Sequence, residues 1–246
     1  MEGLLARHFM LNGRGNRDNR KAARSKVHLI RYADDFVVTA ATPEVAEEAR
    51  ALLVPFLAER GLELSEEKTL VTSIGDGFDF LGWNFRKYSG TMMVKPSKGS
   101  VQRFVREMHD VIVVRGKGMT AEELVRTLTP KVRGFANYHI HTCCSKTFAH
   151  IAYVMWQQLR RWAGRRHPKK GARWVRRRYW RRVGGNDNVF STDGCVLAPI
   201  TWYHVVRHVA RRSDMNPYLD GEYFEERQSM LRRRRSKSFR MPAPVG

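Results

Sequence analysis

Two adjacent aspartates between two short apolar runs constrain the fold of this chain more than any other feature. Residues 28–32 and 36–40 are rich in side chains typical of β-strands, and only Ala33, Asp34 and Asp35 separate them. This pattern predicts a β-hairpin with both carboxylates at a short turn. Two like charges so close together disfavour each other's ionisation, so solvent or a cation must compensate them, and a hard ion such as Mg²⁺ does so well. The alternative is an ordinary acidic turn.

Positive charge is concentrated in the second part of the chain. The 246 residues carry 45 Lys and Arg against 24 Asp and Glu, a net charge of +21. Up to Phe85 there are 11 basic and 13 acidic residues, a net charge of −2, so the remainder carries +23. Residues 160–182 hold 12 basic side chains and no acidic one, interleaved with three tryptophans and a tyrosine.

This basic stretch is typical of a nucleic-acid surface, because guanidinium groups match phosphate oxygens and aromatic rings stack on bases. The alternatives are a solvated helix face and a stripe that lies on a membrane surface. The expected nucleic-acid-binding residues are Arg160, Arg161, Arg165, Arg166, Lys169, Lys170, Arg173, Arg176, Arg177, Arg178, Arg181 and Arg182. Of the interleaved tryptophans, we expect Trp174 and Trp180 to pack in the core rather than to stack on bases.

Several other classes of protein are excluded. The chain is 42% hydrophobic, enough for a real core, and its three cysteines form no disulfide framework, which indicates a reducing compartment. No apolar run approaches the roughly 18 residues of a membrane span, and no signal-peptide core is present, so we expect a soluble protein. Cys143 and Cys144 lie near histidines 139, 141 and 150, but adjacent cysteines suit a tetrahedral zinc site poorly, so we expect no metal there.

The first 95 residues read as hairpins with one helix. The expected elements are a loop over 12–26, a helix capped by Thr42 and kinked or shortened by Pro55, short strands over 62–64 and 70–74, and a hairpin turn at Asp76-Gly77 that leads into the aromatic run 78–85.

The following residues read as helices that carry the basic stretch. The expected features are a cap at Ser97, a capping box at Thr120 and Glu123, a new helix from Thr129-Pro130, a longer helix capped by Ser145, a linker over 184–192, a strand-like segment over 197–206 and a mobile tail from Arg232.

Several segments together resemble the reverse transcriptases encoded by group II introns. Residues 30–38 resemble the active-site hairpin of the palm, residues 62–69 its next conserved segment and residues 78–83 its primer grip. Residues 133–139 and 166–171 are similar to the maturase, or thumb, region, and residues 207–209 and 216–218 to elements that follow it. Each motif is weak alone, but ordered matches over most of residues 27–228 are specific.

The resemblance implies roles by position. Asp34 and Asp35 correspond to the catalytic carboxylates that bind Mg²⁺, with Mn²⁺ as a substitute, and Lys68 would lie near the incoming triphosphate. Substrate contacts are implied for Tyr32, Ala33, Phe80, Leu81, Gly82 and Trp83, the last four at the primer terminus. Without the resemblance, the aromatic residues of this segment would read as core packing and Lys68 as a surface lysine.

The family's fingers and an earlier palm strand with a third metal-binding aspartate have no counterpart here. Only 31 residues precede Tyr32, and their one aspartate, Asp18, sits in a loop-like context, so we do not assign it to the metal. Nor is there a Cys-x-x-Cys pair of the kind found in the family's zinc-containing endonuclease. We therefore expect the chain alone not to polymerise DNA.

The predicted fold class is α+β, with a partial palm over residues 1–95, a helical thumb/maturase domain over 96–183 and a basic C-terminal region over 184–246. The expected function is RNA-directed DNA polymerisation when a separate chain supplies the upstream half. The alternatives are a non-catalytic RNA-binding maturase and a degenerate fragment. The expected partners are group II intron RNA, an RNA template with a DNA primer, and target DNA. No association with a membrane is expected. The expected location is the cytoplasm of a prokaryote, in association with the nucleoid or a ribonucleoprotein, or an organelle.

Overall fold

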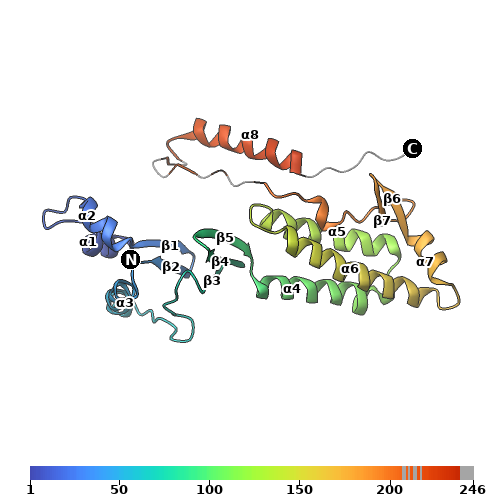
Figure 1. Ribbon diagram of the computed structural model, residues 1–246, viewed down its shortest axis with the longest axis horizontal. Helices are drawn as coiled ribbons and strands as arrows, with labels where there is room; N and C mark the ends of the chain where they lie inside the picture. Colours follow the sequence, from blue (N-terminus) through green and yellow to red (C-terminus); the bar gives the residue numbers. More distant parts are fainter. Residues whose placement is uncertain (207–208, 210, 213–214, 217, 239–246) are drawn as a thin grey trace. The chain divides into compact units, whose positions relative to one another are not determined.

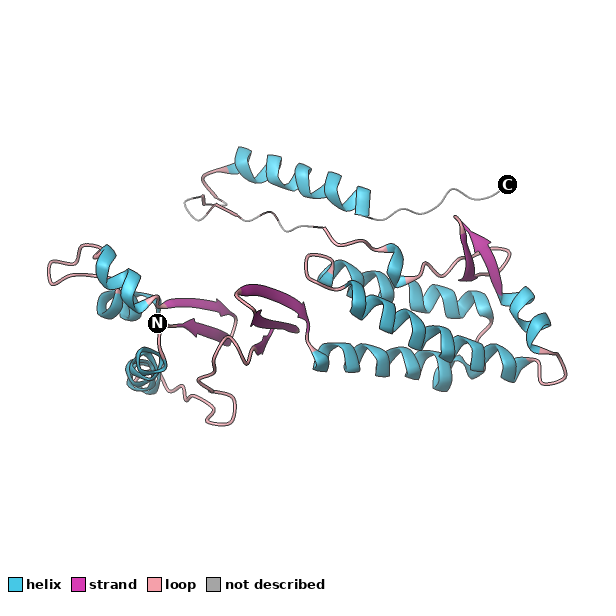
Figure 2. Cartoon of the chain, viewed as in Figure 1, coloured by secondary structure: helices cyan, strands magenta, loops and turns pink. Residues whose placement is uncertain are grey.

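A computed structural model describes residues 1–206, 209, 211–212, 215–216 and 218–238. Its fold is α+β, as predicted, with antiparallel strand pairs and long helices (Figure 2). The chain forms two compact units, one of Met1–Phe80 with Phe85–Thr91 and one of Leu81–Asn84 with Met92–Gly246. None of the described helices is both long enough and apolar enough to cross a membrane.

The first unit has a small core between a hairpin and helices. Its elements are α1 (Glu2–Phe9), α2 (Asn19–Ser25), β1 (His28–Tyr32), β2 (Asp35–Thr39), α3 (Pro43–Ala58) and β3 (Phe78–Phe80). The predicted hairpin is confirmed as the antiparallel pair β1–β2. Fully buried apolar side chains from α1, α3 and the start of the hairpin form the core, namely Leu5, Phe9, Val27, Ala49 and Leu53.

The expected helix after the hairpin is α3, whose Thr42 hydroxyl accepts the Val45 N–H. Pro55 does not end this helix, which continues to Ala58. A proline removes the hydrogen bond to the carbonyl four residues earlier and crowds that carbonyl, here that of the exposed Ala51, where water can replace the lost bond.

For the first unit, the expected loop, the two expected strands and the expected hairpin turn are wrong. Residues 12–26 are not all loop, because Asp18 accepts the N–H groups of Arg20 and Lys21 and so caps α2. The segments 62–64 and 70–74 form no strands. The Lys87 N–H donates to the Ile74 carbonyl at 2.9 Å, but neither segment joins a sheet in the described part of the chain.

The expected hairpin turn is also displaced. Asp76 and Gly77 donate to the Ser73 carbonyl in a turn that no strand precedes. The hairpin turn follows β3 instead, at Leu81 and Gly82, which take φ values of +50° and +78°. There β3 leads into a three-stranded sheet of order β3-β4-β5, with β4 at Trp83–Tyr88 and β5 at Thr91–Pro96.

The second unit is built on long helices that share one core (Figure 1). Its first elements are α4 (Lys98–His109), η1 (Asp110–Val114), η2 (Arg115–Lys117), α5 (Ala121–His139) and α6 (Ser145–Arg166). The predicted caps are confirmed, because the Ser97 hydroxyl accepts the Ser100 N–H and Thr120 forms a reciprocal capping box with Glu123.

A new helix does not begin at Thr129-Pro130, because α5 runs through both residues. Pro130 is exposed, and the Thr129 hydroxyl donates to the Val125 carbonyl at 2.7 Å. Buried side chains on both sides of the proline lie along one face and hold the helix together: Leu124, Val125, Leu128, Val132 and Ala136. The cap of α6 is Cys144 rather than Ser145, which is the first helical residue.

The described chain ends with α7 (Ala172–Tyr179), β6 (Trp180–Val183), β7 (Asn186–Phe190), η3 (Ile200–Trp202) and α8 (Gly221–Ser238). Residues 184–192 are not a linker, because Gly184 and Gly185, both at positive φ, close the β6–β7 hairpin. The strand expected over 197–206 is absent, and its apolar side chains cover the helical core from η3 and its flanks.

The tail expected to be mobile from Arg232 is helical as far as Ser238. The remainder of that tail, residues 239–246, lies outside the described part of the chain. The same is true of Arg207, His208 and Pro217, which belong to the last two segments of the resemblance.

Candidate nucleic-acid interface and acidic hairpin

The two aspartates occupy different positions at the tip of the β1–β2 hairpin. Tyr32 pairs directly with Asp35, which leaves Ala33 and Asp34 as the two turn residues. Ala33 has a φ of +54°, a left-handed conformation that non-glycine residues seldom adopt. Asp34 therefore projects from the turn, and Asp35 begins β2 opposite a tyrosine.

One face of the hairpin is covered and the other is open. Directly paired residues share a face, so Leu29 and Val38 lie together, and both pack against the core of the first unit. Ile30 and the pair Tyr32–Asp35 lie on the opposite face, where Ile30 is 53% and Tyr32 is 65% exposed. Asp35 is thus accessible beside an exposed aromatic ring.

The acidic pair suits Mg²⁺ as an incomplete donor set. Asp34 and Asp35 are both exposed, and among the residues that the structure describes no three His, Cys, Asp or Glu side chains cluster to hold a metal. Mg²⁺ binds through one or two carboxylates and takes its other ligands from water and substrate phosphates. Asp18 accepts backbone N–H groups as the cap of α2, and its exclusion from the metal site stays a prediction.

Lys68 lies in a turn of the first unit, where its backbone N–H donates to the Ser65 carbonyl. Its side chain is exposed, and no hydrogen bond or ion pair between described residues joins it to Asp34 or Asp35. Its role at the triphosphate stays a prediction.

The turn at Leu81 and Gly82 is held firmly within the second unit. The Tyr138 hydroxyl donates to the Leu81 carbonyl at 2.6 Å, and the Ser97 N–H donates to the Gly82 carbonyl at 2.9 Å. The ring of Trp83 stacks on that of Tyr138, with 4.9 Å between centroids. This turn, predicted to contact a primer terminus together with the half-buried Phe80, therefore has a rigid support on α5.

His139 is the buried centre of that support. It is 1% exposed, and its Nδ1 accepts the indole N–H of Trp83 at 3.0 Å. Burial lowers the pKa of His139 to about 4, so the ring is neutral at physiological pH. The sequence motifs include this histidine, but only within a motif and as a rejected zinc ligand. Its partner Trp83 is 56 residues away, so no local sequence pattern predicts the hydrogen bond.

The twelve predicted nucleic-acid-binding residues separate into groups. Four serve the fold, because they bind groups of the same unit. Arg166 donates to the Met119 carbonyl, Arg176 to Asn188 at 2.9 Å, Arg181 to Asp193 at 2.5 Å, and Arg182 pairs with Asp187 at 3.3 Å. The Arg181 hydrogen bond and charge lower the pKa of Asp193.

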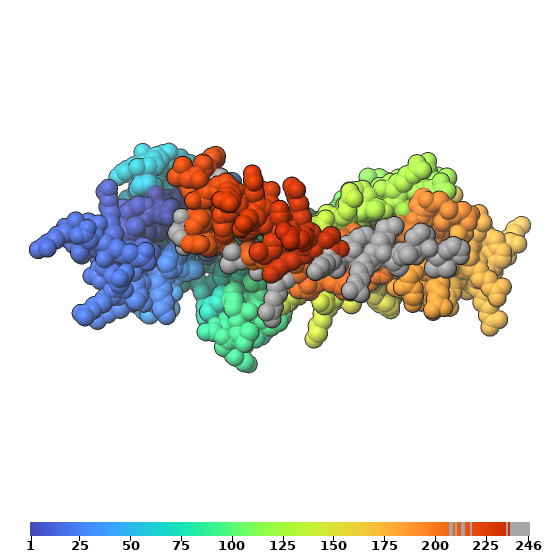
Figure 3. Space-filling model, turned by 90° about the horizontal axis from the view of Figure 1, so that it is seen from above, coloured from blue at the N-terminus to red at the C-terminus, as the bar shows by residue number. Residues whose placement is uncertain are grey.

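The remaining eight are available to a ligand. Arg160 lies over the ring of Trp156 and Lys170 over that of Trp174. The other six are exposed and have neither a hydrogen bond nor an ion pair with any described residue: Arg161, Arg165, Lys169, Arg173, Arg177 and Arg178. We call these six residues the basic face. Figure 3 shows the amber side chains of this part of the chain projecting from one end of the second unit.

The interleaved aromatic residues mostly form core. Trp162, Tyr179 and Trp180 are buried, and the indole N–H of Trp162 donates to the Gly116 carbonyl at 2.6 Å. The expectation of core packing is thus confirmed for Trp180. It is wrong for Trp174, which is 41% exposed beside His167 and presents a ring next to the basic face.

An exposed acidic hairpin in the first unit and exposed basic side chains on the helices of the second are the two surfaces that the sequence singled out. The family model described as reverse transcriptase (RNA-dependent DNA polymerase) matches residues 9–85. The family model described as group II intron, maturase-specific domain, matches residues 101–180. The chain belongs to the group II intron reverse transcriptase/maturase family, as its sequence motifs indicated. No curated protein sequence gave a significant match.

Proposed function

We propose that the chain binds group II intron RNA through the basic face and thereby acts as a maturase. The observation that carries this proposal is that six unpaired basic side chains stand on α6, α7 and the loop between them, over a buried aromatic core. Helices anchored in this way hold cations at fixed spacing, which suits the phosphates of a folded RNA. The exposed Trp174 adds a ring on which a base can stack.

The experiment compares two sets of arginine variants in the full chain. The first set replaces Arg161, Arg165, Arg173 and Arg177 by glutamine, and the control set replaces Arg176, Arg181 and Arg182, which bind within the fold. If the first four each contact a phosphate, the slope of log affinity against log salt falls by about 3, since each contact contributes about 0.7 to 0.9.

The measurement is filter binding of intron RNA at several salt concentrations, with thermal unfolding as the check on folding. The control set is expected to lower the midpoint of unfolding and to change the salt slope little. An unchanged slope in the first set would contradict the proposal, because it would place those four side chains away from the RNA.

A second proposed function rests on the acidic hairpin. The observation that favours it is that both aspartates are exposed at the hairpin tip, Asp35 on the open face beside Tyr32 and Asp34 in the adjoining turn. We propose that they bind Mg²⁺, or Mn²⁺ in its place, for RNA-directed DNA synthesis once the upstream palm and fingers are supplied. A bound divalent ion would supply positive charge for the phosphates of an incoming nucleotide. Lys68 would add a cation, and Tyr32 and Ala33 would contact the substrate.

The test of this second function measures metal binding directly. Mn²⁺ bound by the full chain is followed by electron paramagnetic resonance for the wild type and for a variant with Asp34→Ala and Asp35→Ala. The matched control replaces Glu66 and Glu67, another adjacent and exposed acidic pair of the same unit. Loss of Mn²⁺ only in the aspartate variant, with intron RNA affinity unchanged, is expected. Equal Mn²⁺ binding by all three proteins would contradict the proposed metal site and favour a non-catalytic maturase.

A further inference from the structure

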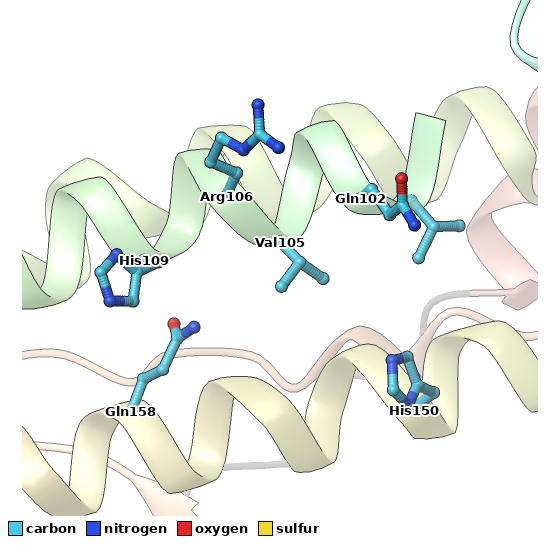
Figure 4. Close-up of a pocket in the computed structure, with 7 residues that line it drawn as sticks. Gln102, Val105, Arg106, His109, His150 and Gln158 are labelled. Atoms are coloured by element: carbon cyan, nitrogen blue, oxygen red, sulfur yellow. The ribbon is translucent and has the colours of Figure 1, made fainter. Parts of the chain in front are cut away.

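A groove of about 560 Å³ runs between α4 and α6, apart from the basic face and the acidic hairpin. Apolar walls come from Val101 and Val105 of α4, and polar groups from Gln102, His150 and Gln158. Figure 4 shows Val105 pointing toward α6, with His150 and Gln158 pointing from α6 toward α4. Since residues 101–109 and 150–158 each span eight helical steps, the groove is about 12 Å long.

One polar group in this groove lacks the partner that its burial requires. Gln158 is 7% exposed, and its Oε1 is shielded from solvent without any hydrogen bond to the described residues. A buried amide oxygen without a donor costs about 1 to 3 kcal/mol. The side chain lines the groove, so a rotation of its amide that turns Oε1 toward the groove would let a ligand there supply the missing hydrogen bond.

The charges around the groove select the ligand. Arg106 and His109 of α4 are exposed on its lining, and neither has a hydrogen bond or ion pair between its side chain and any described residue. Among the residues that the structure describes, none with a carboxylate lines the groove. The acidic residues next to these two in sequence are neutralised, Glu107 by Lys131 and Asp110 by Arg115. An anionic ligand therefore meets only neutral or positive groups.

We propose that this groove takes one unstacked base of the bound RNA. A glutamine amide offers a donor and an acceptor side by side and pairs with a base edge that offers the same two groups. Val101 and Val105 provide apolar contact for the base, and Arg106, at the rim, meets its phosphate. A base splayed out of a bulge or loop is the form in which proteins usually read RNA.

This inference rests on the proposed RNA-binding function and adds a site to it. A peptide segment could also satisfy the amide of Gln158, but the lack of acidic lining residues together with the cation at the rim favours a nucleotide. The two occupants differ in what they predict, because only a nucleotide site makes RNA affinity depend on an unpaired base.

The experiment uses the full chain and short RNA hairpins with the same stem. One hairpin is fully paired, and four carry a single bulged A, C, G or U. Fluorescence anisotropy is expected to show at least one bulged hairpin bound about 10-fold more tightly than the paired one, the scale of one good amide–base pair. Gln158→Leu removes this preference and leaves affinity for the paired hairpin unchanged.

Two further variants test whether the preference depends on the groove. Gln157→Leu changes the neighbouring, half-buried glutamine, which does not line the groove, and retains the preference. Val105→Trp fills the groove and is expected to lose the preference for the bulged hairpin. Thermal unfolding of Gln158→Leu is expected at or above the wild-type midpoint, because an unpaired polar group has been removed.

The outcomes separate the two proposals. Tight, salt-dependent binding of the paired hairpin without preference for any bulge overturns the base site and leaves the basic face standing. A preference that survives Gln158→Leu and Val105→Trp also overturns the site. Failure to bind any of the hairpins or intron RNA overturns both proposals.

Discussion

The indole Nε1–H of Trp83 donates to Nδ1 of His139 across 3.0 Å, joining the turn after β3 to the end of α5. Because Nδ1 accepts this bond, the proton of the neutral imidazole is on Nε2, which lies 3.4 Å from the Ser100 hydroxyl. A protonated ring would carry hydrogens on both nitrogens and could not accept from the indole. The support of the turn therefore depends on a neutral His139.

The stability of the second unit should fall in mild acid because of His139. Its pKa is about 4 in the folded protein and about 6.5 when unfolded, so the unfolded chain binds more protons between these values. The stabilisation is complete above about pH 6.5 and is lost as the pH falls toward 4. The expected loss is on the order of 3 kcal/mol.

Urea unfolding from pH 4 to 7 measures this loss in the wild type and in His139→Phe. The variant has a lower stability at pH 7, because the Trp83 N–H loses its acceptor, but a flatter dependence on pH. Parallel pH curves for the two proteins would show that another group titrates.

The hydroxyl of Tyr138 should contribute to stability through the Leu81 carbonyl. Tyr138→Phe keeps the ring that stacks on Trp83 and removes the 2.6 Å hydrogen bond, so a loss of about 1 kcal/mol is expected. The matched control is Tyr153→Phe on α6, whose exposed ring stacks on Trp156. Denaturant titration of both variants tests the difference, and an equal effect would rule out an anchoring role for the Tyr138 hydroxyl.

Alanine substitutions of Trp174 and Trp180 should have separate effects, the first on RNA binding and the second on folding. Trp180 is buried against Phe190, so Trp180→Ala is expected to cost about 3 to 5 kcal/mol. Trp174 is 41% exposed, so Trp174→Ala should change stability by less than about 1 kcal/mol and lower RNA affinity severalfold. Calorimetry and RNA binding on both variants measure the two effects. A severe loss of folding in Trp174→Ala would contradict this separation.

Sequence patterns predicted the features that depend on nearby residues. The two β-prone runs on either side of Asp34 and Asp35 predicted the hairpin, and Thr120 with Glu123 predicted the start of α5, because a short hairpin and a capping box are each decided within a few positions. The motifs also indicated the family, since they keep its order along the chain.

Features that depend on distant residues could not be predicted in this way. The segments 62–64 and 70–74 have the composition of strands but join no sheet in the described part of the chain, and Leu70 is 76% exposed. Within one run of arginines, the partners Asn188 and Asp193 decide which side chains serve the fold. The groove at Gln158 arises only when α4 packs beside α6, two helices far apart in sequence.

Gly116 should tolerate no side chain. It is buried between η1 and α5, and a Cβ at this position would lie 2.8 Å from the Val111 carbonyl and 3.4 Å from the Trp162 indole nitrogen. The same indole donates to the Gly116 carbonyl, so any backbone shift that relieves the clash also strains that bond. Gly116→Ala is therefore expected to cost about 1 to 3 kcal/mol.

Gly118, two residues later, is the matched control for this substitution. Nothing lies within 4 Å of a Cβ there, and its φ of −91° suits any residue, so Gly118→Ala should be neutral or slightly stabilising because it restricts the unfolded chain. Thermal unfolding of both variants measures the contrast. Equal midpoints would mean that the segment between α4 and α5 yields easily, and the Trp162–Gly116 bond would then not be a rigid anchor of the helical core.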